Sequence, residues 1–319
     1  RREGAGARDR ARGARQGRAD RRAGQSPRLS FLSVPEDLDV LDLEDDFLPG
    51  REIQRETAAT LRPTLRSHVM VDLRGKTLFI TKLGDDHYGQ TYRWYLINSG
   101  LDKKCILKDK ELPTGIALIE LNPKGENRII VSPGANGSLS GNDLKRLSSI
   151  WKGISIFVTQ LEIPLPTVHV ALKMAKDHGT LTLLNPSPPT HLSPNILSLV
   201  DFLVPNEWEA RDLTGLEMKT DQDVQKMADE LLRMGTRNVV ITLGPKGLFF
   251  KNRTEEIWME AFKVKVVDTT AAGDAFMGAL ACSLAENKPI RDVLRFANGA
   301  GALATTKMGA QPSLPSRKE

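Results

Sequence analysis

Residues 266–276 read VVDTTAAGDAF. Val264, Val266 and Val267 favour a strand, the small residues that follow favour a turn, and a helix is expected from Asp274 onward. A carboxylate in the first turn of a helix stabilises the helix dipole by about 0.3–1 kcal/mol. Small residues at such a turn also let an anionic group reach the backbone N–H groups of residues 271–273, with Asp274 beside it as a base. The stretch alone leaves both interpretations open.

The bulk composition is typical of one large α/β domain, with or without a small appendage. The chain has 319 residues, of which 40% are apolar and 27% charged. It has no run of 18 apolar residues, so we expect no membrane span. Cys105 and Cys282 are expected to be buried thiols rather than a disulfide, and the five histidines have no zinc-type spacing. We therefore expect a cytoplasmic protein, with the nucleus left open.

The basic residues are distributed unevenly along the chain. Residues 1–75 contain fifteen Arg and no Lys, and ten of these Arg lie within residues 1–28. Residues 1–28 have too few large apolar side chains to bury a core, so we expect them to be disordered. An arm that binds nucleic acid and an organellar transit peptide are alternatives. The segment lacks interleaved aromatic residues, which disfavours nucleic-acid binding. Residues 1–75 and 76–319 are thus expected to form separate regions.

From residue 76 onward, apolar strands alternate with amphipathic helices. The stretch TLFITKLGDD predicts a strand, and HYGQTYRWYLINSGL predicts a helix that ends at Gly100. Two alternating runs around a Pro/Gly/Asn turn predict a hairpin at about 112–131. The alternation then continues through residue 276. Such a pattern is typical of a mainly parallel sheet that is covered by helices on both faces.

Polar residues follow five of the predicted strands directly. These segments are 160–162 (QLE), 185–188 (NPSP), 205–209 (PNEWE), 242–247 (TLGPKG) and 268–274 (DTTAAGD). In a parallel sheet, ligands bind beyond the carboxyl ends of the strands. The five segments therefore predict a catalytic crevice at one edge of the sheet. This prediction favours the anion-binding interpretation of VVDTTAAGDAF.

The order and spacing of these motifs resemble the ribokinase-type carbohydrate kinases over about residues 76–315. The matching stretches include TGIALIEL, GANGSLS, LNPSPP, LVPNEWEA, VVITLGPKG, VVDTTAAGDAF and GAQPSLP. The NPSPP and PNE elements favour the ribose-directed members over adenosine- or fructose-directed relatives. The resemblance implies an α/β fold, a three-layer sandwich with a mainly parallel central sheet and a small β lid. It implies ATP-dependent phosphorylation of D-ribose at the 5-hydroxyl, with Mg²⁺ accompanying ATP, and formation of a homodimer through the lid.

The resemblance also implies roles for individual residues. Asp274 would accept the proton of the sugar hydroxyl, and the backbone N–H groups of Ala271, Ala272 and Gly273 would stabilise the transferring phosphoryl group. The nucleotide and its Mg²⁺ would contact Asn206, Glu209, Thr242, Leu243, Gly244, Pro245, Lys246, Gly247, Gly273 and Asn298. The sugar would contact Glu162 and Asp274. An activating K⁺ would be held by Asp268, Thr270, Ala304, Lys307, Gly309 and Ser313.

Simpler structural roles remain open for three of these residues. Glu209 could lie on a solvated helix face, Asn298 on an exposed helix surface, and Glu162 could cap a strand end. A Gly-x-x-Gly turn such as 244–247 is also common without any nucleotide.

Two motifs of the family are missing from this sequence. The Asn-x-Asp sugar motif should fall near residues 33–37, which read SVPED, and the GGKGAN loop near residues 61–67, which read LRPTLRS. We therefore expect an incomplete lid and an exposed sheet edge. The alternative function is a catalytically impaired nucleotide-binding relative. A shifted reading frame or an aberrant exon over residues 1 to about 74 would explain the change in composition, and sequencing the transcript tests this hypothesis.

Overall fold

The computed structural model describes residues 58–63, 68–72, 77–121, 127–310, 312–317 and 319. The disorder expected over residues 1–28 and the segment 33–37 both lie outside these residues. In the described part of the chain, no helix is both long and apolar enough to cross a bilayer.

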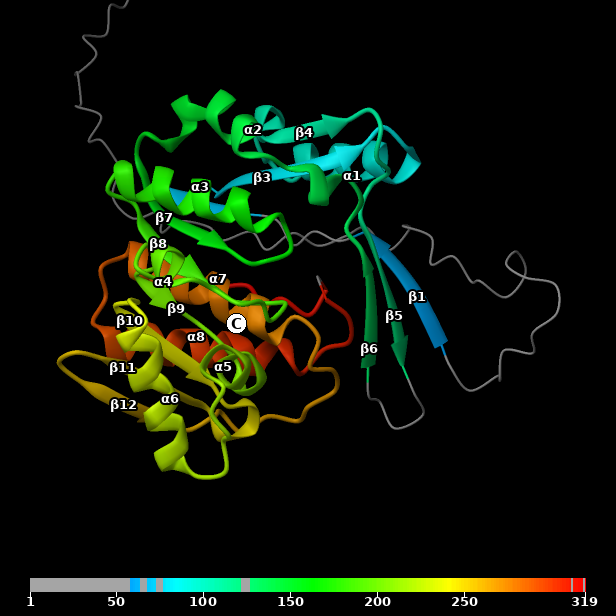
Figure 1. Ribbon diagram of the computed structural model, residues 1–319. Coiled ribbons are helices and arrows are strands. Elements are labelled where there is room, and N and C mark those ends of the chain that lie inside the picture. Colours follow the sequence, from blue (N-terminus) through cyan, green and yellow to red (C-terminus); the bar gives the residue numbers. More distant parts are fainter. Residues whose placement is uncertain (1–57, 64–67, 73–76, 122–126, 311, 318) are drawn as a thin grey trace, which may run out of the picture.

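The centre of the molecule is a nine-stranded sheet of order β12-β11-β10-β9-β8-β7-β2-β3-β4 (Figure 1). Its strands are β2 (His68–Asp72), β3 (Thr77–Gly84), β4 (Ile106–Asp109), β7 (Ile154–Thr159), β8 (Leu181–Leu184), β9 (Phe202–Leu203), β10 (Asn238–Thr242), β11 (Leu248–Asn252) and β12 (Glu256–Met259). Only β2 and β11 run opposite to the other described strands of this sheet. The prediction of a mainly parallel sheet is confirmed.

Helices cover both faces of this sheet, which makes three layers. One face carries α2 (Gly141–Arg146), α3 (Leu165–Asp177), α4 (Pro194–Leu197), α5 (Glu207–Thr214) and α6 (Asp221–Arg233). The other face carries α1 (His87–Asn98), α7 (Ala272–Ala285) and α8 (Ile290–Ala304). Neighbouring residues of β10 enter opposite layers, because Val239 and Ile241 belong to the first core and Val240 to the second. Burial on both faces explains the near-continuous apolar runs of the central strands.

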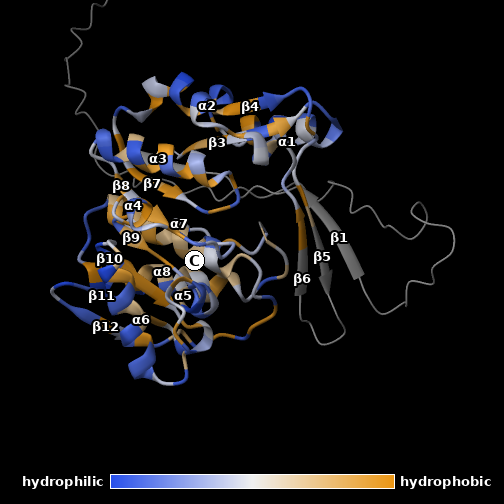
Figure 2. Ribbon diagram, viewed as in Figure 1, coloured by the Kyte–Doolittle hydropathy of each residue, from blue (hydrophilic) through white to orange (hydrophobic). Residues whose placement is uncertain are grey.

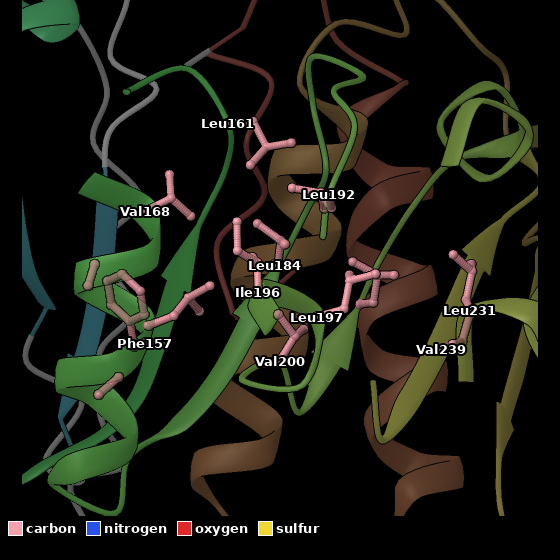
Figure 3. Close-up of a cluster of buried hydrophobic side chains, with 14 of the residues drawn as sticks. Phe157, Leu161, Val168, Leu184, Leu192, Ile196, Leu197, Val200, Leu231 and Val239 are labelled. Atoms are coloured by element: carbon pink, nitrogen blue, oxygen red, sulfur yellow. The ribbon is translucent and has the colours of Figure 1, made fainter. Parts of the chain in front are cut away.

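The first of these cores is the larger one. Figure 3 shows Phe157 and Leu184 from the sheet beside Val168 from α3 and Ile196 from α4. In Figure 2, hydrophobic colouring is concentrated in strands such as β9 and β10, whereas α6 carries hydrophilic residues. α6 shows how the sequence specifies such a helix: Thr220 and Asp223 form a capping box at its start.

A second sheet of three antiparallel strands stands beside the main body (Figure 1). It consists of β1 (Ala58–Pro63), β5 (Ile116–Leu121) and β6 (Asn127–Ser132), in the order β1-β5-β6. β5 and β6 confirm the hairpin predicted at about 112–131. In the central sheet, β2 lies between β3 and β7 and pairs with both, so the sheet edge that we expected to be exposed there is paired. The absence of the two family motifs gave no indication that residues 58–63 and 68–72 form strands β1 and β2.

The carboxylate of Asp86 connects the root of the three-stranded sheet to the main body. Asp86 begins α1, and its side chain accepts hydrogen bonds from the Gly89 N–H (2.7 Å), the Thr114 N–H (2.6 Å) and the Thr114 hydroxyl (2.7 Å). The Thr114 hydroxyl also accepts from the Gly84 N–H at 3.0 Å. Burial raises the pKa of Asp86, but these hydrogen bonds outweigh it and hold the pKa below its ordinary value. The root of β5 is thereby fixed to the end of β3 and the start of α1.

The strand that we predicted over Val264, Val266 and Val267 is wrong. This segment has no strand structure, and Val266 and Val267 are 58% and 50% exposed. It is held instead by the carbonyl of Thr305, which accepts hydrogen bonds from Val267 N (2.7 Å) and Asp268 N (3.2 Å). An apolar alternation cannot indicate whether a sheet edge is available for pairing.

The segment that follows α8 returns across the end of α7. Arg317 forms an ion pair with Glu286 through both carboxylate oxygens, with Nη2 2.9 Å from Oε2, and Lys288 lies 2.9 Å from the same carboxylate. The hydrogen bond from Arg317 lowers the pKa of Glu286 to about 2, because it and the nearby Lys288 outweigh the opposing effect of burial.

The Glu286–Arg317 pair predicts acid sensitivity in a defined range. The folded-state pKa lies below the ordinary value of 4.5, so the stabilisation is fully present above that value and is lost as the pH falls towards 2. Glu286→Gln should lower the free energy of unfolding by about 1–2 kcal/mol at pH 7 and by much less near pH 2. Urea unfolding across this range measures the effect. Glu217→Gln, at an exposed glutamate far from this pair, is the control. An equal loss at every pH would contradict the prediction.

Candidate functional site

A pocket of about 240 Å³ opens at the carboxyl ends of β7, β8, β9 and β10. It is lined by Gln160, Asn185, Ser187, Val204, Asn206, Glu209, Thr242, Thr269, Thr270, Ala271, Gly273, Asp274, Phe276 and Met277. All five of the predicted polar segments contribute to this lining. Four of them converge from the ends of parallel strands, as predicted, whereas segment 268–274 reaches the pocket from the start of α7, with no strand before it.

The start of α7 forms one wall of the pocket. Ala271 precedes the helix with a φ of +62°, a left-handed conformation that costs a non-glycine residue about 1–2 kcal/mol. The first backbone N–H groups of any α-helix have no partner within the helix. Here the Ala272 N–H donates back to the carbonyl of Thr269 at 3.3 Å, and a Cβ on Gly273 would meet nothing within 4 Å. The backbone at Gly273 is thus open to an approaching group.

Asp274 lies in the first turn of α7 and faces the loop that follows β7. Its Oδ1 accepts a hydrogen bond from Nε2 of Gln160 at 3.1 Å. Gln160 stood within a segment that we singled out in the sequence, but the sequence assigned it no role. Its place directly after a buried strand was the available signal. The contact joins residues 114 positions apart.

Asn206 and Glu209 form a capping box at the start of α5. Glu209 N donates to Oδ1 of Asn206 at 2.9 Å, and Oε2 of Glu209 accepts from Asn206 N at 2.8 Å. The same Oε2 accepts from Nδ2 of Asn185 at 3.2 Å. Glu209 is only 4% exposed, so the alternative of a solvated helix face is wrong. The pocket therefore contains two carboxylates, Asp274 in the first turn of α7 and Glu209 in the first turn of α5.

The loop 242–247 leaves β10 beside Asn206. Thr242 lines the pocket and forms an isolated parallel bridge with Asn206, while Leu243 is buried. A short 3₁₀ turn covers Gly244–Lys246, and its residues Gly244, Pro245 and Lys246 are exposed. Gly247 has a φ of +99°, and a Cβ there would lie 1.9 Å from the carbonyl oxygen of Met259. Packing against β12 therefore requires glycine at position 247, with or without a nucleotide.

Two further predicted contacts lie away from the pocket lining. Asn298 on α8 is 8% exposed and donates to the carbonyl of Glu260 at 2.8 Å, so the alternative of an exposed helix residue is wrong. Glu162 is half-buried, two residues beyond the pocket residue Gln160.

The residues predicted to hold K⁺ come together in part around Asp268. Its Oδ1 accepts from the N–H (2.9 Å) and hydroxyl (2.6 Å) of Thr270, and its Oδ2 accepts from Gly309 N at 2.8 Å. Ser313 is fully buried, and its hydroxyl donates to the carbonyl of Ala310 at 2.8 Å. Ala304 is buried at the end of α8, and its carbonyl accepts from the N–H of Lys307 at 3.5 Å. The side chain of Lys307 instead points to Glu319, with 2.6 Å between Nζ and Oε1.

Comparisons with known proteins identify the family of this site. Residues 67–317 match the model of the pfkB family carbohydrate kinases. The chain belongs to this family. It is 37% identical to ribokinase of Staphylococcus aureus over 77% of this chain and 82% of the relative. It is 34% identical to deoxyribokinase of Salmonella typhimurium over 76% of this chain and 80% of the relative.

Solved structures agree with this assignment. Ribokinase of Thermotoga maritima has a TM-score of 0.68 and 36% identity, and covers 76% of this chain and 78% of its own. Arabidopsis thaliana ribokinase complexed with ribose and ATP has a TM-score of 0.69 and 31% identity, and covers 76% and 79%. The fold is thus that of the ribokinases. The protein is a sugar kinase that transfers a phosphoryl group to a sugar hydroxyl.

Substitutions at Glu209 should distinguish the effect of its charge on activity from the effect of its hydrogen bonds on stability. Glu209→Gln keeps an oxygen that can accept from Asn206 N and Asn185 Nδ2, so we expect the kinase to remain stable. Loss of the charge should lower kcat/KM for Mg²⁺–ATP about tenfold. Glu209→Ala also removes the acceptor, and unfolding should become easier by about 1–3 kcal/mol.

Steady-state kinetics and urea unfolding of each variant provide the measurement. Glu207→Gln removes a charge from the first turn of the same helix without touching the pocket lining, and serves as the control. If Glu209→Gln and Glu207→Gln had the same kcat/KM for Mg²⁺–ATP, Glu209 would act only as a helix cap.

Proposed function

We propose that this kinase transfers the γ-phosphoryl group of ATP to the 5-hydroxyl of D-ribose, with Asp274 as the general base. The proposal rests on the position of Asp274. This residue lines the pocket in the first turn of α7, beside the open backbone at Gly273. In the transfer, the bond between the γ-phosphorus and the ADP oxygen breaks and a bond to the sugar oxygen forms. The hydroxyl proton passes to Asp274.

The wall formed by α7 suits this chemistry. Phosphoryl transfer depends mainly on positioning and on stabilising negative charge. The positive end of the α7 dipole and the N–H groups of its first turn stabilise an anion that approaches there. One such donor typically contributes about 10²–10³ in rate. Asp274 itself needs no unusual basicity, since the attacking hydroxyl becomes acidic only as the new bond forms.

Mg²⁺ would enter with ATP. Among the described residues, no group of three or more His, Cys, Asp or Glu lies together in a way that could hold a metal ion. Mg²⁺ needs no such cage, because it keeps several waters and binds phosphates with one or two protein oxygens. Asn206 and Glu209 offer amide and carboxylate oxygens at the pocket, which suits contact through waters. When bound, the ion would neutralise charge on the phosphates.

An activating K⁺ would bind at the loop that begins with Asp268. K⁺ favours carbonyl and hydroxyl oxygens, and this loop brings the carboxylate of Asp268 and the hydroxyl of Thr270 within 2.6 Å of each other. The loop continues directly into Ala271 and α7. An ion bound there would help to hold the start of the helix in position.

A coupled assay of ADP release tests the proposed function. We expect turnover only when ribose and Mg²⁺–ATP are both present, and several-fold faster turnover in KCl than in choline chloride. Ribose should be preferred over 2-deoxyribose and fructose. ATP binding without sugar-dependent ADP release would support the alternative, an impaired nucleotide-binding relative. Equal rates in KCl and choline chloride would reject the cation site alone.

Asp274→Asn tests the proton acceptor. We expect kcat to fall by about 10²–10⁴, since an amide cannot accept the proton, while ATP affinity measured by calorimetry stays within a few-fold. Asp292→Asn is the matched control, because Asp292 is exposed in the first turn of α8. If Asp274 only stabilised the helix dipole, the two variants would behave alike, and each would lose a few tenths of a kcal/mol of stability.

A further inference from the structure

Gln160 connects the loop after β7 with the start of α7. Its Nε2 donates to Oδ1 of Asp274 at 3.1 Å. The backbone on either side is fixed, because the Thr159 carbonyl accepts from Asn185 N at 3.1 Å and Leu161 N donates to the Ser187 carbonyl at 2.8 Å. The side chain therefore starts from a fixed position when it reaches Asp274.

The other end of the same amide has no partner. Oε1 of Gln160 is buried and makes no hydrogen bond to any residue that the structure describes. The orientation of the amide follows from chemistry, because a carboxylate only accepts hydrogen bonds, and Nε2 must therefore face Asp274. A buried carbonyl oxygen without a donor costs about 1–3 kcal/mol. Because Gln160 lines the pocket, a bound ligand that displaces the atoms covering Oε1 can supply the missing donor.

We propose that Gln160 links the acceptor sugar to the base: it orients Asp274 through Nε2 and accepts a hydrogen bond from a second sugar hydroxyl through Oε1. The inference rests on the proposed function, in which the pocket holds a sugar and Asp274 takes the proton of the reacting hydroxyl. The hydroxyl bound by Gln160 must be a different one, since the reacting proton is directed to Asp274. Gln160 is thus a positioning residue that also determines specificity.

A neutral amide suits this position better than a carboxylate. Asp274 and Glu209 already place two carboxylates in a pocket that receives phosphates. A third negative charge about 3 Å from Asp274 would repel both the base and the nucleotide. Only a primary amide joins an N–H donor for Asp274 to an oxygen acceptor for the sugar without adding charge.

Two substitutions test the proposal, each with a matched control. Gln160→Met keeps the side-chain length and removes both polar groups, whereas Gln160→Glu replaces the donor by a charge. Gln225 provides the controls Gln225→Met and Gln225→Glu, because its Nε2 also donates to a carboxylate, Glu256 at 3.4 Å, on the exposed surface.

For Gln160→Met we expect kcat to fall about 10–100-fold and KM for the sugar to rise, with KM for ATP within twofold of wild type. Gln160→Glu should be at least as impaired. Both Gln225 variants should match wild type. Gln160→Met should also unfold at a similar temperature, because it loses a hydrogen bond and an unpaired buried oxygen together. Wild-type kcat and sugar KM in Gln160→Met would overturn the proposal, as would a KM for ATP that rises in parallel with that for the sugar.

Deoxy sugars identify the hydroxyl that Gln160 binds. In the wild type, removing that hydroxyl should lower kcat/KM by about 10–100-fold, because Oε1 is left unpaired. Gln160→Met should phosphorylate the same deoxy sugar and its parent sugar with similar kcat/KM. If every 2-deoxy and 3-deoxy analogue carries the same penalty in both proteins, Gln160 does not contact the sugar.

The comparison also works when the proposed substrate is wrong. It is made with the best acceptor among ribose, 2-deoxyribose and fructose, so preference for another sugar rejects ribose and still tests Gln160. If no sugar is turned over, calorimetric sugar binding to the protein loaded with Mg²⁺–ADP replaces kinetics. Weaker binding to Gln160→Met would then support the contact, and equal or absent binding to both proteins would overturn it.

Discussion

The parallel pairing of β7, β8, β9 and β10 determines where chemistry can take place in this molecule. Because the four strands point the same way, the loops that leave them emerge at one edge of the sheet. The segments at these strand ends supply three kinds of group: amides at Gln160 and Asn185, a carboxylate at Glu209 and a hydroxyl at Thr242. α7 then closes this edge from the opposite layer. For β7, which has 6 residues, reversal would move its group to the opposite end of the strand, about 20 Å away.

The pocket holds two carboxylates, Asp274 and Glu209, each in the first turn of a helix. The helix dipole and the first-turn N–H groups of α7 act on the side of Asp274, and the N-terminus of α5 acts on the side of Glu209. Each carboxylate also accepts hydrogen bonds from neutral amides, from Gln160 for Asp274 and from Asn185 for Glu209. Two helix N-termini and two amides therefore stabilise these charges, and the described residues that line the pocket include no arginine or lysine. In the proposed reaction, a cation that arrives with the nucleotide would add positive charge beside these carboxylates.

Local patterns in the sequence predicted the elements well and the contacts between them poorly. The Pro/Gly/Asn turn was sufficient to predict the hairpin of β5 and β6, and the alternation of strands and helices predicted the three layers. The strand expected at 264–267 failed, because periodicity says nothing about whether a neighbouring strand is available. Asn298 on α8 packs against the loop at Glu260, whose carbonyl accepts a hydrogen bond from its side chain. The helical periodicity of α8 cannot predict which loop covers it. The contact between Gln160 and Asp274 depends likewise on the packing of two layers.

The capping box at α5 shows why a motif at a strand end can be read in two ways. Asn206 and Glu209 satisfy each other's backbone N–H groups, which alone would account for both residues. A cap needs no burial, however, and helices such as α6 begin with an exposed threonine in the same motif. Glu209 differs because it is almost fully buried and because its Oε2 also binds Asn185 at the end of the adjacent strand. Burying a carboxylate is unfavourable unless its charge serves a partner. The burial of Glu209 beside a pocket is therefore the stronger sign of function, and the capping box is the means by which the carboxylate is held there.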